Sequence, residues 1–259
     1  MIVQIYEIQT PQEAEKCIQL GVDHLGSVLL NKDEWRIPTL KEVFNLTERT
    51  DAKNSLIPLF KEGEVLFKAL DYYRPDFVHF CTSPTDGQGH VAELDQFAEY
   101  QARLREKFPQ IGVIHSVPVP MKGVCPRFSA TEIALSFEPF SDMLLIDTWL
   151  GKEPVEGFIG LTGKTADWDV ARDLVSRCRI PVVLAGGLSP TNVYEAVMKV
   201  RPAGTDSCTE TNLKDKDGRP IRFKKDFQKV AQFVKEVRRA ESDLLSTGLT
   251  DAHIIRSLF

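Results

Sequence analysis

The stretch Pro181-Val182-Val183-Leu184-Ala185-Gly186-Gly187-Leu188-Ser189-Pro190-Thr191-Asn192-Val193 carries the local signals that decide the fold. Its first apolar residues indicate a buried strand, and the two glycines mark a tight turn. Ser189 followed by Pro190 predicts a helix start, because serine accepts hydrogen bonds from free N–H groups and proline suits the first turn. Strand, turn and helix in this order form one unit of a parallel α/β sheet.

The same strand-and-helix unit recurs along the whole chain. The strand-like runs are short, rich in Val, Ile, Leu and Phe, and bounded by Gly, Pro, Asp and Asn. Near-continuous apolar strands are typical of parallel sheets, whose two faces are both covered. We predict eight strands, at Ile2–Glu7, His24–Leu30, Ser55–Phe60, Asp76–Cys81, Ile111–Val117, Met143–Thr148, Pro181–Gly186 and Gly204–Cys208.

Segments with an apolar residue every three or four positions separate these strands, as amphipathic helices require. Eight such units in 259 residues predict a single-domain (βα)8 TIM barrel, since this fold takes about 250 residues. An open doubly wound sheet also alternates strands and helices, but eight regular units favour closure. Residues 245–259 are predicted to form a C-terminal helical extension packed on the barrel. The clearest other helices are expected at Pro11–Leu20, Val91–Phe108, Val193–Val200 and Lys224–Leu244.

The charge pattern argues against a nucleic-acid or membrane partner. The chain has 32 basic and 37 acidic residues and a formal net charge of -5. Its densest basic run, Arg222-Phe223-Lys224-Lys225, is followed by Asp226, so we expect it to open a solvated helix. There is no apolar run long enough for a membrane span and no signal-peptide pattern. We predict a cytoplasmic monomer or homodimer that binds a small anionic molecule.

Five cysteines lie at positions 17, 81, 125, 178 and 208, without a CxxC pair. An odd, dispersed set is typical of reduced thiols, and the ligand spacing of a zinc site is missing. We therefore predict neither a bound metal nor a cofactor.

Four segments of the second half follow one another in a specific order: Leu144–Thr148 (LLIDT), Gly160–Trp168 (GLTGKTADW), Leu184–Val193 (LAGGLSPTNV) and Pro202–Asp206 (PAGTD). They resemble the phosphoribosylanthranilate isomerase family, which has LLD, GGTG-x-x-x-DW, LAGGL-x-P-x-NV and P-x-GVD. More faintly, Val3–Ile8 (VQIYEI) lies where the family has VKICGI. The resemblance implies a (βα)8 barrel that opens the ring of an aminoaldose and forms an aminoketose.

This rearrangement needs a general acid near the ring oxygen and a general base near C2 of the sugar. Asp147 matches the family's acid and ends a predicted strand, where barrel sites lie; the alternative is a carboxylate that caps a loop. Tyr6 stands where the family has its basic cysteine, and Gln4 where it has a lysine. A tyrosine of ordinary pKa is a poor base, so we predict that Glu7, with a pKa raised by burial, replaces it. Glu7 as a plain surface residue is the alternative, and little turnover of the family's substrate is expected.

Gly186 and Gly187 precede a predicted helix start, so their backbone can approach an anion that the helix N-terminus attracts. Cys208, Thr209 and Glu210 stand where the family has its SSG phosphate-binding turn, which is a departure from the family pattern. We expect a phosphate at Gly186, Gly187, Cys208 and Thr209. A tight turn that binds nothing is the alternative. Glu210 is adjacent and would repel a phosphate unless it turns outward.

Arg36 matches the family arginine that grips the substrate's carboxylate, and a planar guanidinium suits that anion. An ion pair with Asp33 or Glu34 is the alternative. His115 is expected near the same rim as His79, although histidines in barrel strands are often packing residues. The other residues predicted to contact the substrate are Tyr6, His79, Cys81, Gly160 and Gly163.

The leading hypothesis is an isomerase acting on an aminoaldose or phosphosugar-like substrate by acid–base chemistry. A lyase or condensing enzyme on the same scaffold and a non-catalytic metabolite-binding protein are alternatives, because this fold hosts many unrelated reactions. An acid, a base and an anion cradle that converge within about 10 Å would favour catalysis. A mouth filled by Tyr6 and the Gly151–Gly157 loop would favour binding alone.

Overall fold

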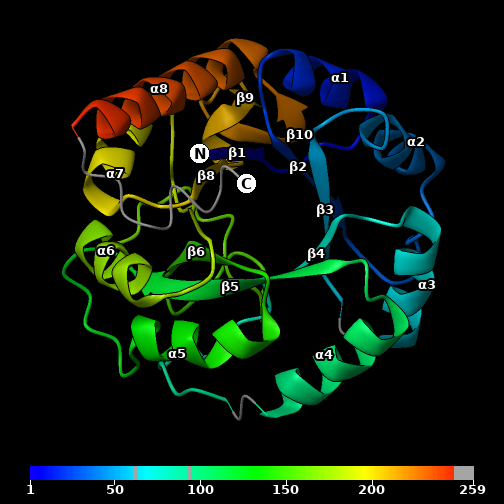
Figure 1. The fold of residues 1–259 in the computed structure, drawn as a ribbon, viewed down its shortest axis with the longest axis horizontal. Helices are drawn as coiled ribbons and strands as arrows, with labels where there is room; N and C mark the ends of the chain where they lie inside the picture. The colour runs from blue at the N-terminus through cyan, green and yellow to red at the C-terminus, as the bar shows by residue number, and fades with distance from the viewer. Residues whose placement is uncertain (61–62, 93–94, 248–259) are drawn as a thin grey trace.

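The computed structural model describes residues 1–60, 63–92 and 95–247. In this part of the chain, eight parallel strands form a closed barrel in sequence order, with β8 paired to β1. Eight helices, α1 to α8, surround the strands as a ring (Figure 1). The predicted (βα)8 TIM barrel is confirmed.

The strands of the barrel match the predicted runs to within a few residues. They are β1 (Ile2–Ile5), β2 (His24–Leu29), β3 (Lys53–Pro58), β4 (Phe77–Phe80), β5 (Gly112–Pro120), β6 (Met143–Trp149), β7 (Val182–Leu184) and β8 (Gly204–Ser207). The helices are α1 (Pro11–Gln19), α2 (Pro38–Thr47), α3 (Gly63–Tyr73), α4 (Asp95–Lys107), α5 (Ala130–Phe137), α6 (Trp168–Arg177), α7 (Val193–Val200) and α8 (Phe227–Ser246). Two short 3-10 helices are η1 (Glu138–Phe140) and η2 (Thr209–Thr211).

An antiparallel hairpin interrupts the last unit between β8 and α8. Its strands are β9 (Asn212–Lys214) and β10 (Pro220–Lys225), and Figure 1 shows it between α8 and α1. The turn contains Asp217-Gly218, a dipeptide typical of tight hairpins. The prediction that Arg222 to Lys225 opens a helix is therefore wrong. The helix begins at Phe227, where the Asp226 side chain accepts hydrogen bonds from the first free N–H groups.

Two other predicted helix boundaries change. Val91, where a helix was expected to begin, instead forms an isolated bridge with Thr85, and the described helix α4 spans Asp95–Lys107. At the other end, α8 runs through Ser246, so the first residues of the expected extension belong to this helix. The remainder of that extension, 248–259, lies outside the described residues.

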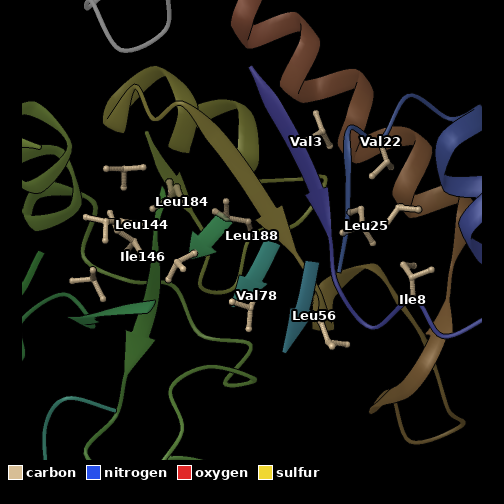
Figure 2. Packing of buried hydrophobic residues seen from close by; sticks show 14 of the residues in the cluster. Val3, Ile8, Val22, Leu25, Leu56, Val78, Leu144, Ile146, Leu184 and Leu188 are labelled. Carbon is tan, nitrogen blue, oxygen red and sulfur yellow. The ribbon is translucent and has the colours of Figure 1, made fainter. Parts of the chain in front are cut away.

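Alternate residues of each strand face opposite sides of the barrel wall. Those that point outward pack against the helices in a large core, which Figure 2 shows at Val3, Leu25, Leu56, Val78, Leu144 and Leu184. Those that point inward form a second, smaller cluster: Tyr6, Ile114, Met143, Leu145, Val183 and Ala185. The side chains two positions further along these inward faces are therefore the ones that reach the mouth of the barrel.

Within the described ranges, no helix combines the length and the apolar character needed to cross a membrane.

Tyr6 fills the barrel interior against Gly26 of β2. A Cβ atom on Gly26 would lie 2.0 Å from Cδ1 of Tyr6. We predict that Gly26→Ala lowers the free energy of unfolding by about 1–3 kcal/mol, as overpacking typically does. Tyr6→Cys in the same chain should recover part of this loss, because the smaller side chain vacates the space. Urea unfolding of both single variants and the double variant measures the coupling, and strictly additive changes would contradict the contact.

Candidate active site

A cavity opens at the carboxyl ends of the barrel strands and encloses about 590 Å³, counting its open mouth. An apolar wall with a few convergent polar groups is typical of sites that bind small molecules. The apolar wall includes Val28, Ile57, Leu59, Val155 and Phe158. The polar groups are Tyr6, Glu7, His79, Ser116, Asp147, Asp206 and Arg222.

A chain of hydrogen bonds crosses the floor of the cavity. The hydroxyl of Tyr6 lies 2.7 Å from Oγ of Ser55 and 2.7 Å from Nδ1 of His79. Nε2 of His79 lies 2.9 Å from Oγ of Ser116. Burial lowers the pKa of His79 to about 3 and raises the pKa of Tyr6 well above 10. Both groups are therefore neutral at pH 7, and the network shapes and positions the floor.

Two carboxyl groups lie beside this network, Asp147 on β6 and Asp206 on β8. Burial raises the pKa of Asp147 to about 7. The hydrogen bond that its carboxylate accepts from the N–H of Thr148 at 2.7 Å lowers the pKa, but by less than burial raises it. Burial and the charge of Asp147 raise the pKa of Asp206 to about 8. Gln4 donates to Asp206 at 3.2 Å, which offsets part of that rise. Between these two values the pair holds one proton, so it contains an acid and a base together.

Gly160 closes over the carboxyl of Asp147. Its backbone has a φ of +107°, and an added Cβ atom would lie 2.4 Å from Oδ2 of Asp147. The sequence predicted Gly160 as a substrate contact, and in the structure a side chain at this position would collide with the carboxyl of Asp147. Ile159 and Leu161 also line the cavity, so the loop excludes water from one side of Asp147.

Glu7 lies in a different environment from the one that its predicted role as base requires. Its carboxylate accepts hydrogen bonds from Arg222 Nε at 2.6 Å, Asn212 Nδ2 at 3.0 Å and the Phe223 N–H at 3.2 Å. Burial by itself would raise its pKa, but these bonds and the charges of Arg222 and Lys225 outweigh burial, so the pKa is lowered. The prediction that burial raises the pKa of Glu7 is therefore wrong. A carboxylate with a lowered pKa and three donors is a weak base, and Glu7 instead ties the hairpin to the end of β1.

Two thiols also line the cavity. Burial raises the pKa of Cys81 to about 12 and raises the pKa of Cys208 even further. Neither thiol forms a thiolate near neutral pH, so both are contact residues in this site.

The residues predicted to bind phosphate line a small pocket next to Asp147 and Asp206. This pocket contains Gly163, Gly186, Gly187, Ser207, Cys208, Thr209 and Glu210. A Cβ atom on Gly187 would lie 2.6 Å from the backbone of Lys164, so the glycine is required for packing of the neighbouring loop. The carboxylate of Glu210 lies 3.6 Å from Nζ of Lys214, which offsets part of its negative charge.

The helix behind this pocket has the predicted bounds, Val193–Val200, but a different N-cap. Its N-cap is Asn192 rather than Ser189, and α7 starts at Val193. The Asn192 side chain accepts a hydrogen bond from the Ser189 N–H at 2.8 Å and donates one to the Gly187 carbonyl at 3.0 Å. The asparagine thus fixes the turn that the sequence assigned to serine and proline.

Two predicted residues lie away from the cavity. Arg36 packs over the ring of Tyr72, 4.8 Å from its centroid, and lines a separate surface depression. His115 has the opposite strand parity to its neighbour Ser116, so it faces outward, where it bonds Ser141 and stacks on Phe137. Among the described residues, no group of histidine, cysteine or carboxylate side chains could hold a metal ion.

Comparisons with known proteins identify the scaffold. A family model of N-(5'-phosphoribosyl)anthranilate (PRA) isomerase matches residues 99–236. An N-(5'-phosphoribosyl)anthranilate isomerase from Methanopyrus kandleri is 37% identical over 241 residues, which are 91% of this chain and 98% of the relative.

The chain belongs to the N-(5'-phosphoribosyl)anthranilate isomerase family.

Proteins of lower sequence identity are also similar to this chain. A multifunctional tryptophan biosynthesis protein from Phycomyces blakesleeanus is 24% identical over 91% of this chain, which corresponds to 32% of that protein. A crystal structure of phosphoribosyl anthranilate isomerase in complex with reduced 1-(o-carboxyphenylamino)-1-deoxyribulose 5-phosphate has a TM-score of 0.63 and 21% identity. It covers 92% of this chain and 100% of its own, and at this identity it shows the fold alone.

The sequence analysis missed two cavity residues with ionisable side chains, Asp206 and Arg222. Asp206 shares the signal that singled out Asp147, a carboxylate on the inward face near the end of a strand, and the family motif contained it. Arg222 was misassigned because its basic run was read as the start of a helix. The Asp217-Gly218 turn signal would have predicted the hairpin that carries it.

The two raised carboxyl pKa values predict how stability depends on pH. A carboxyl whose pKa is raised by folding favours the folded state while it is protonated. This contribution is lost as the pH rises from about 4 to 8 for Asp206. Asp206→Asn does not ionise, so it should raise Tm at pH 9 by roughly 5 °C or more, with little difference at pH 4.

Calorimetric melting from pH 4 to 9 checks this expectation. Asp217→Asn on the exposed hairpin turn is the matched control and should follow the wild type at every pH. A constant offset between Asp206→Asn and the wild type across the range would show that Asp206 is not a buried proton-binding group.

Proposed function

We propose that this chain isomerises N-(5'-phosphoribosyl)anthranilate, an aminoaldose phosphate, to the matching aminoketose, as a step of tryptophan biosynthesis. The observation that carries the proposal is the Asp147–Asp206 pair on the floor of the cavity, with pKa values of about 7 and 8. The family membership and the names of its relatives support the choice of substrate. A lyase or a non-catalytic binding protein has no comparable support, since the pair supplies an acid and a base for an isomerisation.

The reaction divides into two proton transfers and a tautomerisation. We assign the first transfer to Asp147, at the position of the family's acid, in the form of the pair whose single proton lies on Asp147. The pKa values favour the proton on Asp206, so this reactive form is the less populated of the two. Asp147 gives its proton to the ring oxygen while the C1–O bond breaks and the nitrogen lone pair forms a C1=N bond. Asp206 then removes the proton from C2, and the electrons of that C–H bond form C1=C2 and neutralise the nitrogen. The resulting enol gains a proton at C1 and loses its hydroxyl proton, which leaves the ketone at C2.

Asp206 takes the role of base because the other titratable groups of the cavity do not suit it. Tyr6 and the two thiols stay protonated, His79 has its two ring nitrogens engaged with Tyr6 and Ser116, and Glu7 is engaged by three donors. The expectation of little turnover depended on a missing base. Asp206 is a second carboxyl that lines the cavity, so a base is present and low turnover is no longer expected.

The cavity and the adjoining pocket match the two ends of the substrate. The apolar wall of Val28, Ile57 and Phe158 suits the aromatic ring, and the pocket around Gly187 and Thr209 suits the phosphate. Asp147 and Asp206 line both spaces, so a ribose that joins the two ends lies over the carboxyl pair. The cytoplasmic location and the choice between monomer and homodimer stay predictions.

Turnover of phosphoribosylanthranilate by the purified protein, followed by the loss of substrate fluorescence, tests the proposal. We expect clear activity in the wild type and a loss of roughly 10²–10⁴-fold in each of Asp147→Asn and Asp206→Asn, the range of a single acid or base. The kcat/KM of the wild type should peak between about pH 7 and 8, since both carboxyls are protonated below and ionised above this range.

Inactive wild-type protein would reject the function. Activity that survives Asp206→Asn but not Asp147→Asn would keep the function and remove the role given to Asp206. Because the Asn variants are expected to be at least as stable as the wild type, a loss of activity cannot be ascribed to unfolding when melting is checked in parallel.

Gln4 provides a further test, since it stands where the family resemblance expects lysine and donates to Asp206. A lysine at this place would favour the ionised carboxyl, so Gln4→Lys should move the pH optimum of kcat/KM to lower pH. Gln4→Met removes the hydrogen bond without adding charge, so it should move the optimum upward. Identical pH profiles for the three proteins would show that Gln4 does not tune the carboxyl pair.

A further inference from the structure

The substrate assigned above carries a carboxylate on its aromatic ring, and a cavity that binds it needs a cation. The residue that the family resemblance offered, Arg36, lies over Tyr72 and does not line the cavity. Of the described residues that line it, Arg222 is the one with a positive charge at neutral pH, because His79 is neutral.

We propose that Arg222, on the hairpin inserted after β8, binds the carboxylate of the substrate, and that Glu7 positions it. The proposal rests on the function proposed above. It goes beyond that function because it moves the recognition of the carboxylate to an element outside the repeating βα units.

The geometry of the ion pair supports this role. Glu7 engages Nε of Arg222 at 2.6 Å, which is one of the five N–H donors of the guanidinium. Among the described residues, the two Nη groups have no hydrogen-bond partner, and 42% of the side chain is exposed. A planar guanidinium held by its Nε can present both Nη groups to a carboxylate in a bidentate pair.

The unfavourable backbone conformation of Glu7 also supports its role in positioning Arg222. Glu7 has a φ of 64°, in the left-handed region, and it aligns with a glycine in the family's VKICGI segment. A residue with a Cβ atom is disfavoured there by about 1–2 kcal/mol. The three hydrogen bonds of the Glu7 carboxylate to the hairpin offset this conformational cost, and they join β1 to Arg222.

A second anchor holds the base of the same hairpin. Nζ of the buried Lys225 donates to the Cys208 carbonyl at 2.9 Å and to the Asn212 side chain. The hairpin is therefore fixed to the ends of both β1 and β8, on the side where Asp206 and Cys208 line the cavity. This attachment lets Arg222 hold a carboxylate in a constant position relative to the carboxyl pair.

The test compares steady-state kinetics with equilibrium binding of anthranilate measured by calorimetry. Arg222→Gln should raise KM for phosphoribosylanthranilate and weaken anthranilate binding by roughly 10–100-fold, with kcat little changed, as expected for a lost charged hydrogen bond. Arg222→Lys should fall between, because it keeps the charge but not the fork. Glu7→Gly, which removes the anchor and relieves the backbone, should raise KM as well.

Arg219→Gln removes the same charge from an exposed position of the same hairpin and should leave both measurements unchanged. An effect in Arg36→Gln and none in Arg222→Gln would return the carboxylate to Arg36 and overturn the proposal. Wild-type protein that binds no anthranilate would overturn it too. If the wild type binds anthranilate through Arg222 but does not turn over the substrate, the isomerase function fails and the carboxylate site stands.

Discussion

The inside of a closed parallel barrel receives every second side chain of each strand, and this alternation organises the rest of the molecule. Most outward residues are apolar and bury against the helices, and His115 is one of the polar exceptions. On several strands the inward residues change from apolar to polar toward the carboxyl end, as in Leu145 and Asp147 of β6. The carboxyl ends of the strands therefore bring polar groups from distant parts of the chain into one cavity.

Low solvent access gives these polar groups their chemistry. Burial keeps Tyr6 and His79 neutral, and it raises the pKa of both Asp147 and Asp206 toward neutrality. A carboxylate in water would be ionised at pH 7 and could not serve as an acid. The same burial that makes the pair costly for the fold makes it suited to proton transfer.

The hairpin after β8 adds charge to a site that otherwise has few cations. Its attachment depends on Glu7, a carboxylate in a strained backbone position whose hydrogen bonds all go to the hairpin. Neighbouring residues at the end of β1 therefore have separate roles in the same site. Tyr6 fills the floor, Glu7 holds the hairpin, and Gln4 contacts Asp206.

The sequence by itself determined the barrel, the order of its strands and the place of Asp147, because these follow from local apolar periodicity and from motifs whose residues are close in the chain. It also contained the parity that separates His115 from Ser116 and the turn signal of the hairpin. The tertiary structure alone decided that Glu7 is an anchor, that Arg222 rather than Arg36 faces the cavity, and that Asp206 has a raised pKa. The role of Glu7 and the placement of Arg222 depend on a contact between residues about 200 positions apart. The pKa of Asp206 is raised by burial at the barrel mouth and by the charge of Asp147. Local sequence does not encode the burial and charge that such tertiary contacts create.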